Sequence, residues 1–522
     1  MNRILHSFPA LWLAAAAVSA GCAQNARVES SGGDPLSAAE SITAADMVAR
    51  IGALAHDSMG GRDTPSPGLE KAAAYLAGEF RALGLEPGGE GGTYLQRYPL
   101  PLRKLDISSV HFGIVNREGQ DNRMLEYGVD FFTAPVQRQE GVDMSHGRFH
   151  WVGRLGDGGL PPAEYGERTL LVTQVPGPPN RDWRLAVQAA QRAAQEIEAT
   201  GLLVVLGPEF SREVMGRMAE TAGRPQRVLV TPGERPTFFV TQAAWQGILE
   251  REGKTAADLP PQPSEAIVFE NVRAHYDAFA DVVEDANPPN VVAILPGRDP
   301  ELQDTYVVFS AHMDHVGIGT ADATGDSIYN GADDDASGTS ALVEVAQAFA
   351  SLSEPPRRSL VFLAVSGEEK GLLGSRWFTD HPTIPIESIV ANINVDMIAR
   401  NAPDSIVVIG QEYSSLGPLV RSVAAEHPGL GLAVVPDPWP EERFFFRSDH
   451  FNFARHEIPA LFFFAGVHDD YHRPSDEVER IDGDKAARVA RLVFHTAYAI
   501  AEAAEPPRWT DEGLTEIRAL TR

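Results

Sequence analysis

The chain has 522 residues, of which 43% are hydrophobic and 22% are charged, a composition that predicts a globular protein with more than one domain. Its formal net charge of −28 disfavours binding to nucleic acids and to anionic lipid surfaces, because both are themselves negatively charged. The single cysteine excludes an internal disulfide and thiolate zinc sites of the CxxC type, so any metal would be held by histidine and carboxylate side chains.

The first 21 residues have the pattern of a signal peptide. Arg3 precedes the apolar run 11–18, which is too short to span a bilayer, and Ser-Ala-Gly before Cys22 resembles a bacterial lipoprotein box. We expect residues 1–21 to be removed and residues 22–44, rich in Ser, Gly and Ala, to tether the protein to a lipid on Cys22 in the cell envelope. That lipid would be the only membrane contact. Cleavage of an ordinary signal peptide, followed by secretion, is the alternative.

Two different regions follow the tether. Residues 45–100 are predicted to be mainly helical, since Met47, Ile51 and Leu54 recur at helical spacing. Residues 101–284 combine short strand-like runs with a helix rich in Ala and Gln, have prolines near both ends, and contain no dense group of histidines and carboxylates. We expect this second region to be an inserted mixed α/β domain.

From residue 285 onward, apolar strands and helices alternate regularly. This alternation predicts an α/β fold with a mainly parallel sheet covered by helices on both faces. A tail, 506–522, follows. The expected strands are 291–295, 306–311, 360–365, 389–395, 405–409 and 459–465, and the expected helices lie near 339–352, 372–379, 415–426 and 485–505.

Five groups of acidic residues and histidines punctuate this part of the chain. Four of them follow predicted strands, so they can meet at one edge of the sheet, where ligands bind in open α/β folds. Each group alone could be a solvated turn, a surface loop or a helix cap without any function. Together the groups offer the imidazoles and carboxylates that two zinc ions require. The groups are His312-Met313-Asp314, Gly331 to Gly338, Gly367-Glu368-Glu369, Asn394-Val395-Asp396 and Asp470-Tyr471-His472.

These motifs resemble those of the M28 family of zinc peptidases, in particular members with an inserted protease-associated (PA) domain. The resemblance covers residues 45–100 and 285–505 and is only compositional over residues 101–284. It implies a zinc-dependent exopeptidase fold, a mixed sheet with a mainly parallel core, in which the two covered segments form one discontinuous domain and the insert is PA-like.

The resemblance also implies a set of metal ligands. Asp334 would bridge two zinc ions, and the peptide bond after it would be cis. Asp333 and Asp335 are the rival choices for the bridge. His312 and Asp396 would complete one ion, and the other would be completed by Glu369 and His472.

Three further residues would take part in catalysis. Glu368 would act as general base and then as general acid. Asp314 would accept a hydrogen bond from the second ring nitrogen of the ligand His312. Tyr471 would stabilise the oxyanion of the tetrahedral intermediate, with a packing role as the alternative. The other histidines near the motifs are expected to bind no metal; they are His315, His450, His456 and His468.

The predicted reaction is hydrolysis of peptide bonds by a di-zinc exopeptidase through a metal-bridging hydroxide. The frequency of activities within the family favours an aminopeptidase that removes N-terminal residues. A carboxypeptidase or dipeptidase stays open, because the sequence singles out no carboxylate-binding arginine among Arg376, Arg443, Arg447 and Arg473. A single-zinc glutaminyl cyclase, an acyltransferase on the same body, is a further alternative. A non-catalytic relative would have lost ligands that this chain retains.

One segment could select the side chain of the substrate. Trp439 and the run 444–446, three phenylalanines, would wall an apolar pocket, or the phenylalanines would belong to the core.

Overall fold

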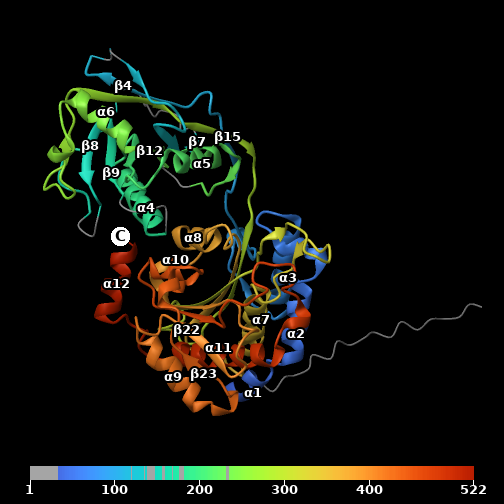
Figure 1. Cartoon of the computed structure of the whole chain (residues 1–522). Helices are drawn as coiled ribbons and strands as arrows, with labels where there is room; N and C mark the ends of the chain where they lie inside the picture. The colour runs from blue at the N-terminus through green and yellow to red at the C-terminus, as the bar shows by residue number, and fades with distance from the viewer. Residues whose placement is uncertain are drawn as a thin grey trace, which may run out of the picture.

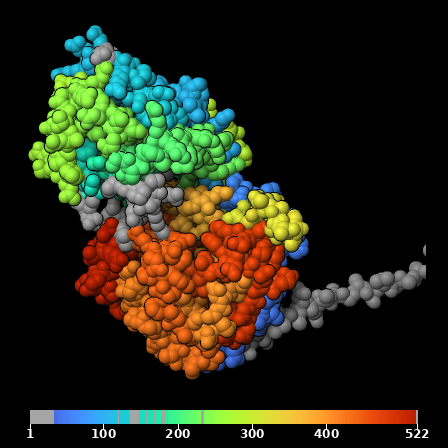
Figure 2. Space-filling model, viewed as in Figure 1, coloured from blue at the N-terminus to red at the C-terminus, as the bar shows by residue number. Residues whose placement is uncertain are grey.

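The computed structural model describes residues 33–521 except 119, 121, 135, 138–146, 156–158, 167, 176–180 and 231–233. These residues form two lobes, a larger one that contains both ends of the described chain and a smaller one made from the insert (Figures 1 and 2). No helix in the described part of the chain is long and apolar enough to cross a membrane. The predicted signal peptide and Cys22 lie outside the described residues.

A nine-stranded mixed sheet forms the centre of the larger lobe. Its middle strands β20, β17, β21 and β24 pair in parallel, whereas β16 and β22 pair antiparallel to them on either side. The predicted fold class, a mixed sheet with a parallel core, is therefore confirmed. The strands are β1 (Glu86–Pro87), β2 (Leu95–Arg97), β16 (Pro289–Leu295), β17 (Tyr306–His312), β20 (Ser359–Val365), β21 (Ile389–Val395), β22 (Ser405–Ile409), β23 (Ala433–Val435) and β24 (Ala460–Phe464).

Helices cover both faces of this sheet, as predicted. Val307 and Phe309 of β17 face a core shared with α2, α3, α7, α9 and α11, while Val308 between them faces a core shared with α8 and α10. Successive strand residues point to opposite faces, so an unbroken apolar strand needs cover on both. The helices are α2 (Ala44–Leu54), α3 (Pro67–Ala82), α7 (Ala336–Ala350), α8 (Leu373–Asp380), α9 (Leu416–Glu426), α10 (His450–Ala454) and α11 (Gly483–Glu502).

The two ends of the described chain pack onto the larger lobe. Residues 33–44 were predicted to belong to a tether, but Ala38 and Ala39 of α1 (Pro35–Glu40) are buried in the main core, and so is Ile42 after the helix. The tether prediction is wrong for this stretch, because its small and branched apolar side chains pack against the core of the larger lobe. At the other end, α12 (Asp511–Thr521) buries Ile517 in a cluster with the phenylalanines of residues 444–446.

The insert has a six-stranded sheet with an apolar core on each face. Its helices are α4 (Arg181–Glu196), α5 (Arg212–Gly223) and α6 (Gln242–Glu252). The six strands are β13 (Ile267–Val268), β8 (Arg148–Gly153), β9 (Thr169–Gln174), β10 (Gly201–Val205), β12 (Thr237–Val240) and β6 (Phe131–Thr133). Smaller sheets are formed by β11 (Gln226–Arg227), β3 (Leu102–Leu105), β15 (Phe279–Glu284) and β7 (Val136–Gln137), and by β14 (Val272–Asp277), β4 (His111–Asn116) and β5 (Arg123–Met124).

The insert joins the larger lobe through adjacent chain segments. β2 before it and β16 after it pair with each other in the nine-stranded sheet, and β3 and β15 pair at the base of the insert. The chain therefore leaves and re-enters the larger lobe at one place. The PA identity of the insert stays a prediction.

Candidate metal centre

Polar side chains gather where the strands of the nine-stranded sheet end. His312 is the last residue of β17, Glu369 follows β20, and Asp396 directly follows β21. Asp334 lies just before α7, and His472 follows β24. Because neighbouring parallel strands end at the same edge of a sheet, residues far apart in the sequence converge there.

Two groups of these side chains could each hold a metal ion. His312 Nε2 lies 3.3 Å from Asp334 Oδ1 and 3.6 Å from Asp396 Oδ1. His472 Nε2 lies 3.1 Å from Asp334 Oδ2 and 3.0 Å from Glu369 Oε2. Asp334 thus directs one carboxylate oxygen into each group, which is what a residue that bridges two ions must do.

Of the three consecutive aspartates, Asp334 alone belongs to these groups among the described residues. Asp335 accepts hydrogen bonds from the main-chain nitrogen of His312 and from main-chain nitrogens in α7 and after β21. Asp333 Oδ1 accepts one from the main chain of Ala399 at 2.7 Å. Asp333 and Asp335, the two rival choices for the bridging residue, therefore bind main-chain nitrogens around the site. The Asp334–Asp335 peptide bond is cis, as the resemblance implied.

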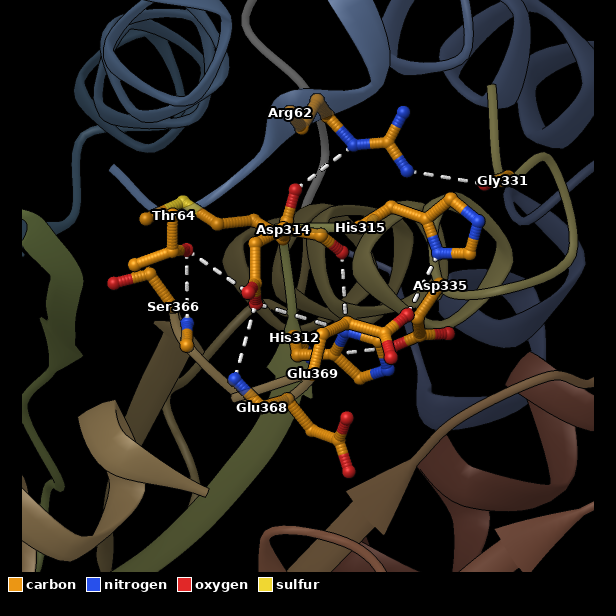
Figure 3. A network of polar contacts seen from close by, with 12 residues as sticks. Arg62, Thr64, His312, Asp314, His315, Gly331, Asp335, Ser366, Glu368 and Glu369 are labelled. Atoms are coloured by element: carbon orange, nitrogen blue, oxygen red, sulfur yellow. Dashed lines mark hydrogen bonds and ion pairs between the residues drawn. The ribbon is translucent and has the colours of Figure 1, made fainter. Parts of the chain in front are cut away.

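His315 also belongs to the second group, contrary to the sequence-based expectation that it binds no metal. Its Nδ1 lies 2.8 Å from Glu369 Oε1 and 3.6 Å from Asp334 Oδ2, and the residue is fully buried. The position of His315 three residues after His312, just past the end of β17, was the sequence signal that could have found it (Figure 3).

The donor set fits zinc. Several donor atoms are buried without a hydrogen-bond partner among the described residues: Asp334 Oδ2, Glu369 Oε1, Asp396 Oδ1, His472 Nε2 and both ring nitrogens of His315. Leaving so many polar atoms unpaired would cost on the order of 1–3 kcal/mol each, unless another group satisfies them. Imidazole nitrogen and carboxylate oxygen are donors that zinc accepts, so two ions would satisfy these atoms.

The charges of the site support the same conclusion. Burial, followed by the charge of Glu369, raises the pKa of Glu368 well above its ordinary value. Burial raises the pKa of Asp314 to about 6. Burial would also raise the pKa of Asp334, but the neighbouring imidazoles hold it well below its ordinary value. Carboxylates packed this closely in a low dielectric require cations among them.

Asp314 positions the loop of Glu368 rather than the ring of His312. Its carboxylate accepts hydrogen bonds from Thr64 Oγ1 at 2.9 Å and from the main-chain nitrogen of Glu368 at 3.3 Å (Figure 3). His312 Nδ1 lies 3.1 Å from the main-chain oxygen of Asp314 and 3.8 Å from its carboxylate. The predicted hydrogen bond to the carboxylate is thus replaced by one to the carbonyl, because the carboxylate is already engaged.

Two further residues that the sequence analysis did not assign hold the loops of the site. Arg62 is fully buried and donates from Nε to the main-chain oxygen of Met313 at 2.9 Å and from Nη2 to that of Gly331 at 3.0 Å (Figure 3). Asp476 accepts hydrogen bonds from the main-chain nitrogens of Asp333 and Asp334. Asp476 follows His472 closely in the sequence, whereas nothing in the sequence around Arg62 marked it.

The other candidate residues lie around the groups. The ring of Tyr471 stacks on that of His472, with 3.9 Å between centroids, and its catalytic role stays a prediction. His450, His456 and His468 lie outside both groups. The phenylalanines of residues 444–446 pack in a buried cluster, and Phe446 also lines the cleft described next.

A cleft of about 1130 Å³ opens beside the metal centre between the two lobes. Glu368 and Glu369 belong to its lining, together with residues from α4 of the insert and from α8 and α10 of the larger lobe. The site is therefore accessible from a space that both lobes shape.

Residues 290–497 match Peptidase family M28. A probable zinc metalloprotease of Leptosphaeria maculans is 26% identical over 261 residues, which cover 42% of this chain and 58% of the relative. A probable leucine aminopeptidase of Trichophyton verrucosum is 26% identical over 228 residues, covering 42% of this chain and 60% of the relative. The matches span between 24% and 66% of the length of the similar curated relatives.

Among solved structures, an aminopeptidase from Aneurinibacillus sp. strain AM-1 aligns with 91% of this chain and 97% of its own, at 18% identity and a TM-score of 0.47.

Proposed function

We propose that the chain is a zinc-dependent aminopeptidase with two metal ions, because residues 290–497 match Peptidase family M28. The observation that carries the proposal is the placement of Asp334, whose two carboxylate oxygens face two separate groups of donors. The existence of two groups argues against a single-zinc glutaminyl cyclase.

The ligands divide unequally between the two ions. His312, Asp334 and Asp396 would hold the first, and the second would be held by Asp334, Glu369, His472 and His315. Bound zinc would supply Lewis acidity, which polarises the scissile carbonyl and lowers the pKa of water toward about 7.

Glu368 is the proposed general base and acid. It is a member of neither donor group, its main chain is held by Asp314, and it lines the cleft beside Glu369. Its carboxylate would take a proton from the attacking water as the oxygen of that water bonds to the carbonyl carbon. The same carboxylate would then deliver the proton to the leaving amine as the carbon–nitrogen bond breaks. Tyr471, stacked on His472, would donate a hydrogen bond from its hydroxyl group to the oxyanion.

The direction of attack is proposed from the relatives. Two similar curated proteins are named probable leucine aminopeptidases. The shape of the site does not by itself select the N-terminus over the C-terminus of a peptide. The test is a set of peptides with the same sequence and either a free or an acetylated N-terminus. Acetylation should abolish release of the first residue. Release of residues from the carboxyl end of both peptides would instead identify a carboxypeptidase.

The location in the cell is proposed from the sequence alone. The lipoprotein-like segment around Cys22 supports export and anchoring to the cell envelope by a lipid. Wild-type protein should partition into a detergent phase when expressed with its leader in a bacterium, and the Cys22→Ser variant should stay in the aqueous phase. Equal partitioning of both would contradict lipidation.

A further inference from the structure

The cleft beside the metal centre must hold most of the substrate, if the proposed function is right. An aminopeptidase places a single residue before the scissile bond, so the rest of the peptide lies beyond it. The cleft, at about 1130 Å³, is large enough for a short peptide. Figure 1 places α4 of the insert opposite α8 and α10, and residues of all three helices line the cleft.

The lining is basic, although the chain as a whole is strongly acidic. Among the described residues, seven cationic side chains line the cleft against four acidic ones, and two of those acids, Glu368 and Glu369, belong to the metal centre. The cations are Arg192, Arg227, Arg235, Lys370, Arg376, Arg447 and Arg455.

Some of these cations have carboxylate partners of their own. Lys370 Nζ lies 2.8 Å from Asp63 Oδ1, Arg447 Nη1 lies 3.2 Å from Glu442 Oε2, and Arg227 pairs with Glu284. These pairs contribute little net positive charge to the cleft.

Arg376 and Arg455, by contrast, share one carboxylate. Arg376 Nε lies 3.5 Å from Asp380 Oδ2, and Arg455 Nη2 lies 3.2 Å from Asp380 Oδ1. His456 Nε2 is also 3.2 Å from the same carboxylate. One carboxylate neutralises only one of the two guanidinium groups, so this group of three side chains keeps a net positive charge.

Arg192 of α4 approaches this pair from the insert. Burial, and next the positive charges of Arg455 and Arg376, lower the pKa of Arg192, while Glu196 and Asp380 act in the opposite direction. Arg192 therefore experiences repulsion from the guanidinium groups of Arg376 and Arg455 across the cleft that all three residues line. An added anion would relieve this repulsion.

The side of α4 that lines the cleft consists of polar residues. Its cleft-lining residues are Gln188, Gln191, Arg192 and Gln195, which recur at helical spacing and so share one face. Val187, Ala190 and Ala194 anchor the other face in the core of the insert. The face of α4 toward the cleft is therefore polar, and Gln191 on it donates to Thr237 Oγ1.

We propose that Arg192, Arg376 and Arg455 form a subsite for a carboxylate of the peptide on the leaving side of the scissile bond. Arginine suits this role because its planar guanidinium can bind a carboxylate through two parallel hydrogen bonds. The carboxylate would come either from the C-terminus of a short peptide or from an acidic side chain after the first residue. The substrate class would thus be short or acidic peptides.

The test compares matched peptides on the zinc-loaded full chain. Leu-Ala-Ala and Leu-Ala-Ala-amide differ only in the terminal carboxylate, and Leu-Glu-Ala-amide and Leu-Gln-Ala-amide differ only in the side chain. For the pair that carries the recognised carboxylate, kcat/KM should be about tenfold higher for the acid, as one charge-assisted hydrogen bond predicts. Arg192→Gln should bring that ratio close to one, mainly through KM.

A matched control separates this effect from general loss of charge. Arg217 lies on α5 of the same lobe and is solvent-exposed, so Arg217→Gln should preserve the ratio. Equal rates for both members of both pairs in the wild type, or an unchanged ratio in Arg192→Gln, would overturn the subsite while leaving the aminopeptidase function intact. Absence of hydrolysis of any free-amine peptide would overturn the proposed function, and the subsite with it.

Discussion

The imidazole of His315 and the carboxylate of Glu369 approach to 2.8 Å, measured from Nδ1 to Oε1. The Nδ1 of His315 nevertheless has no hydrogen-bond partner among the described residues, so this short distance lacks the alignment of a hydrogen bond. His472 Nε2 likewise lies 3.0 Å from Glu369 Oε2 and has no hydrogen-bond partner among the described residues. Both imidazoles are therefore placed as neighbouring donors to one ion would be.

The first prediction follows from this relationship. Replacement of His315 by Ala should weaken the binding of one of two zinc ions by at least about tenfold, since it removes a donor from the second group only. Calorimetric titration of zinc into chelator-treated protein would measure both affinities, and X-ray absorption would count the histidine ligands. His456→Ala is the control, because His456 lies outside both groups. Two unchanged affinities in the His315 variant would refute its role as a ligand.

The second prediction separates the proposed base from its neighbour. Glu368→Ala should lower kcat by about 10² to 10⁴-fold and keep two zinc ions, because Glu368 belongs to neither donor group. Glu369→Ala should lose zinc as well as activity. Elemental analysis of both variants alongside peptide hydrolysis would distinguish them. Activity of the Glu368 variant within tenfold of the wild type, with zinc bound, would exclude it as the base.

The third prediction concerns Arg62, which ties the N-terminal helical region to the loops of the site. Arg62→Met should destabilise the protein by about 3–5 kcal/mol, because buried carbonyl oxygens, including those of Met313 and Gly331, would lose their donors. Urea unfolding would measure the loss. Arg217→Met, at an exposed position, should change stability by no more than about 0.5 kcal/mol. A similar small effect for both would mean that water replaces the guanidinium.

The fourth prediction is a pH dependence of stability that originates far from the metal centre. His495 on α11 is buried and stacks on His427, with 3.7 Å between ring centroids. Burial, and next the charges of His427 and Arg491, lower the pKa of His495 to about 4. In the unfolded chain the pKa is about 6.5. The folded state therefore binds fewer protons between these values, and its stability should fall as the pH drops from about 6.5 to about 4.

Replacement of His495 by Phe should flatten this dependence. Urea unfolding would measure the free energy of unfolding of both proteins at pH 5 and pH 7.5. Because the metal ligands titrate alike in the two proteins, their contribution cancels when the two pH dependences are subtracted. Parallel losses of stability in the two proteins would show that His495 does not titrate as expected.

The strands of the larger lobe could be predicted from the sequence because each strand is marked by a run of apolar residues within its own segment. In 306–312, every residue from Val307 to Ala311 except Ser310 is apolar, and such a run can be buried on both faces only as a strand between helical layers. The flanking motifs then place His312 and Asp396 at strand ends. Weakly apolar segments lack such a signal, which is why α1 was taken for part of a tether.

From the sequence alone follow the order of the motifs, the strands that carry them and hence the convergence of the aspartates 333–335 with the other motifs. Which aspartate faces both groups follows from the tertiary structure, since main-chain donors from α7 and from the segment after β21 bind the neighbouring Asp335. The tertiary structure also brings His315 to Glu369, and it places Arg192 and Arg455 on the same cleft. The direction of a side chain depends on packing partners that are distant in the chain, and no local pattern encodes them.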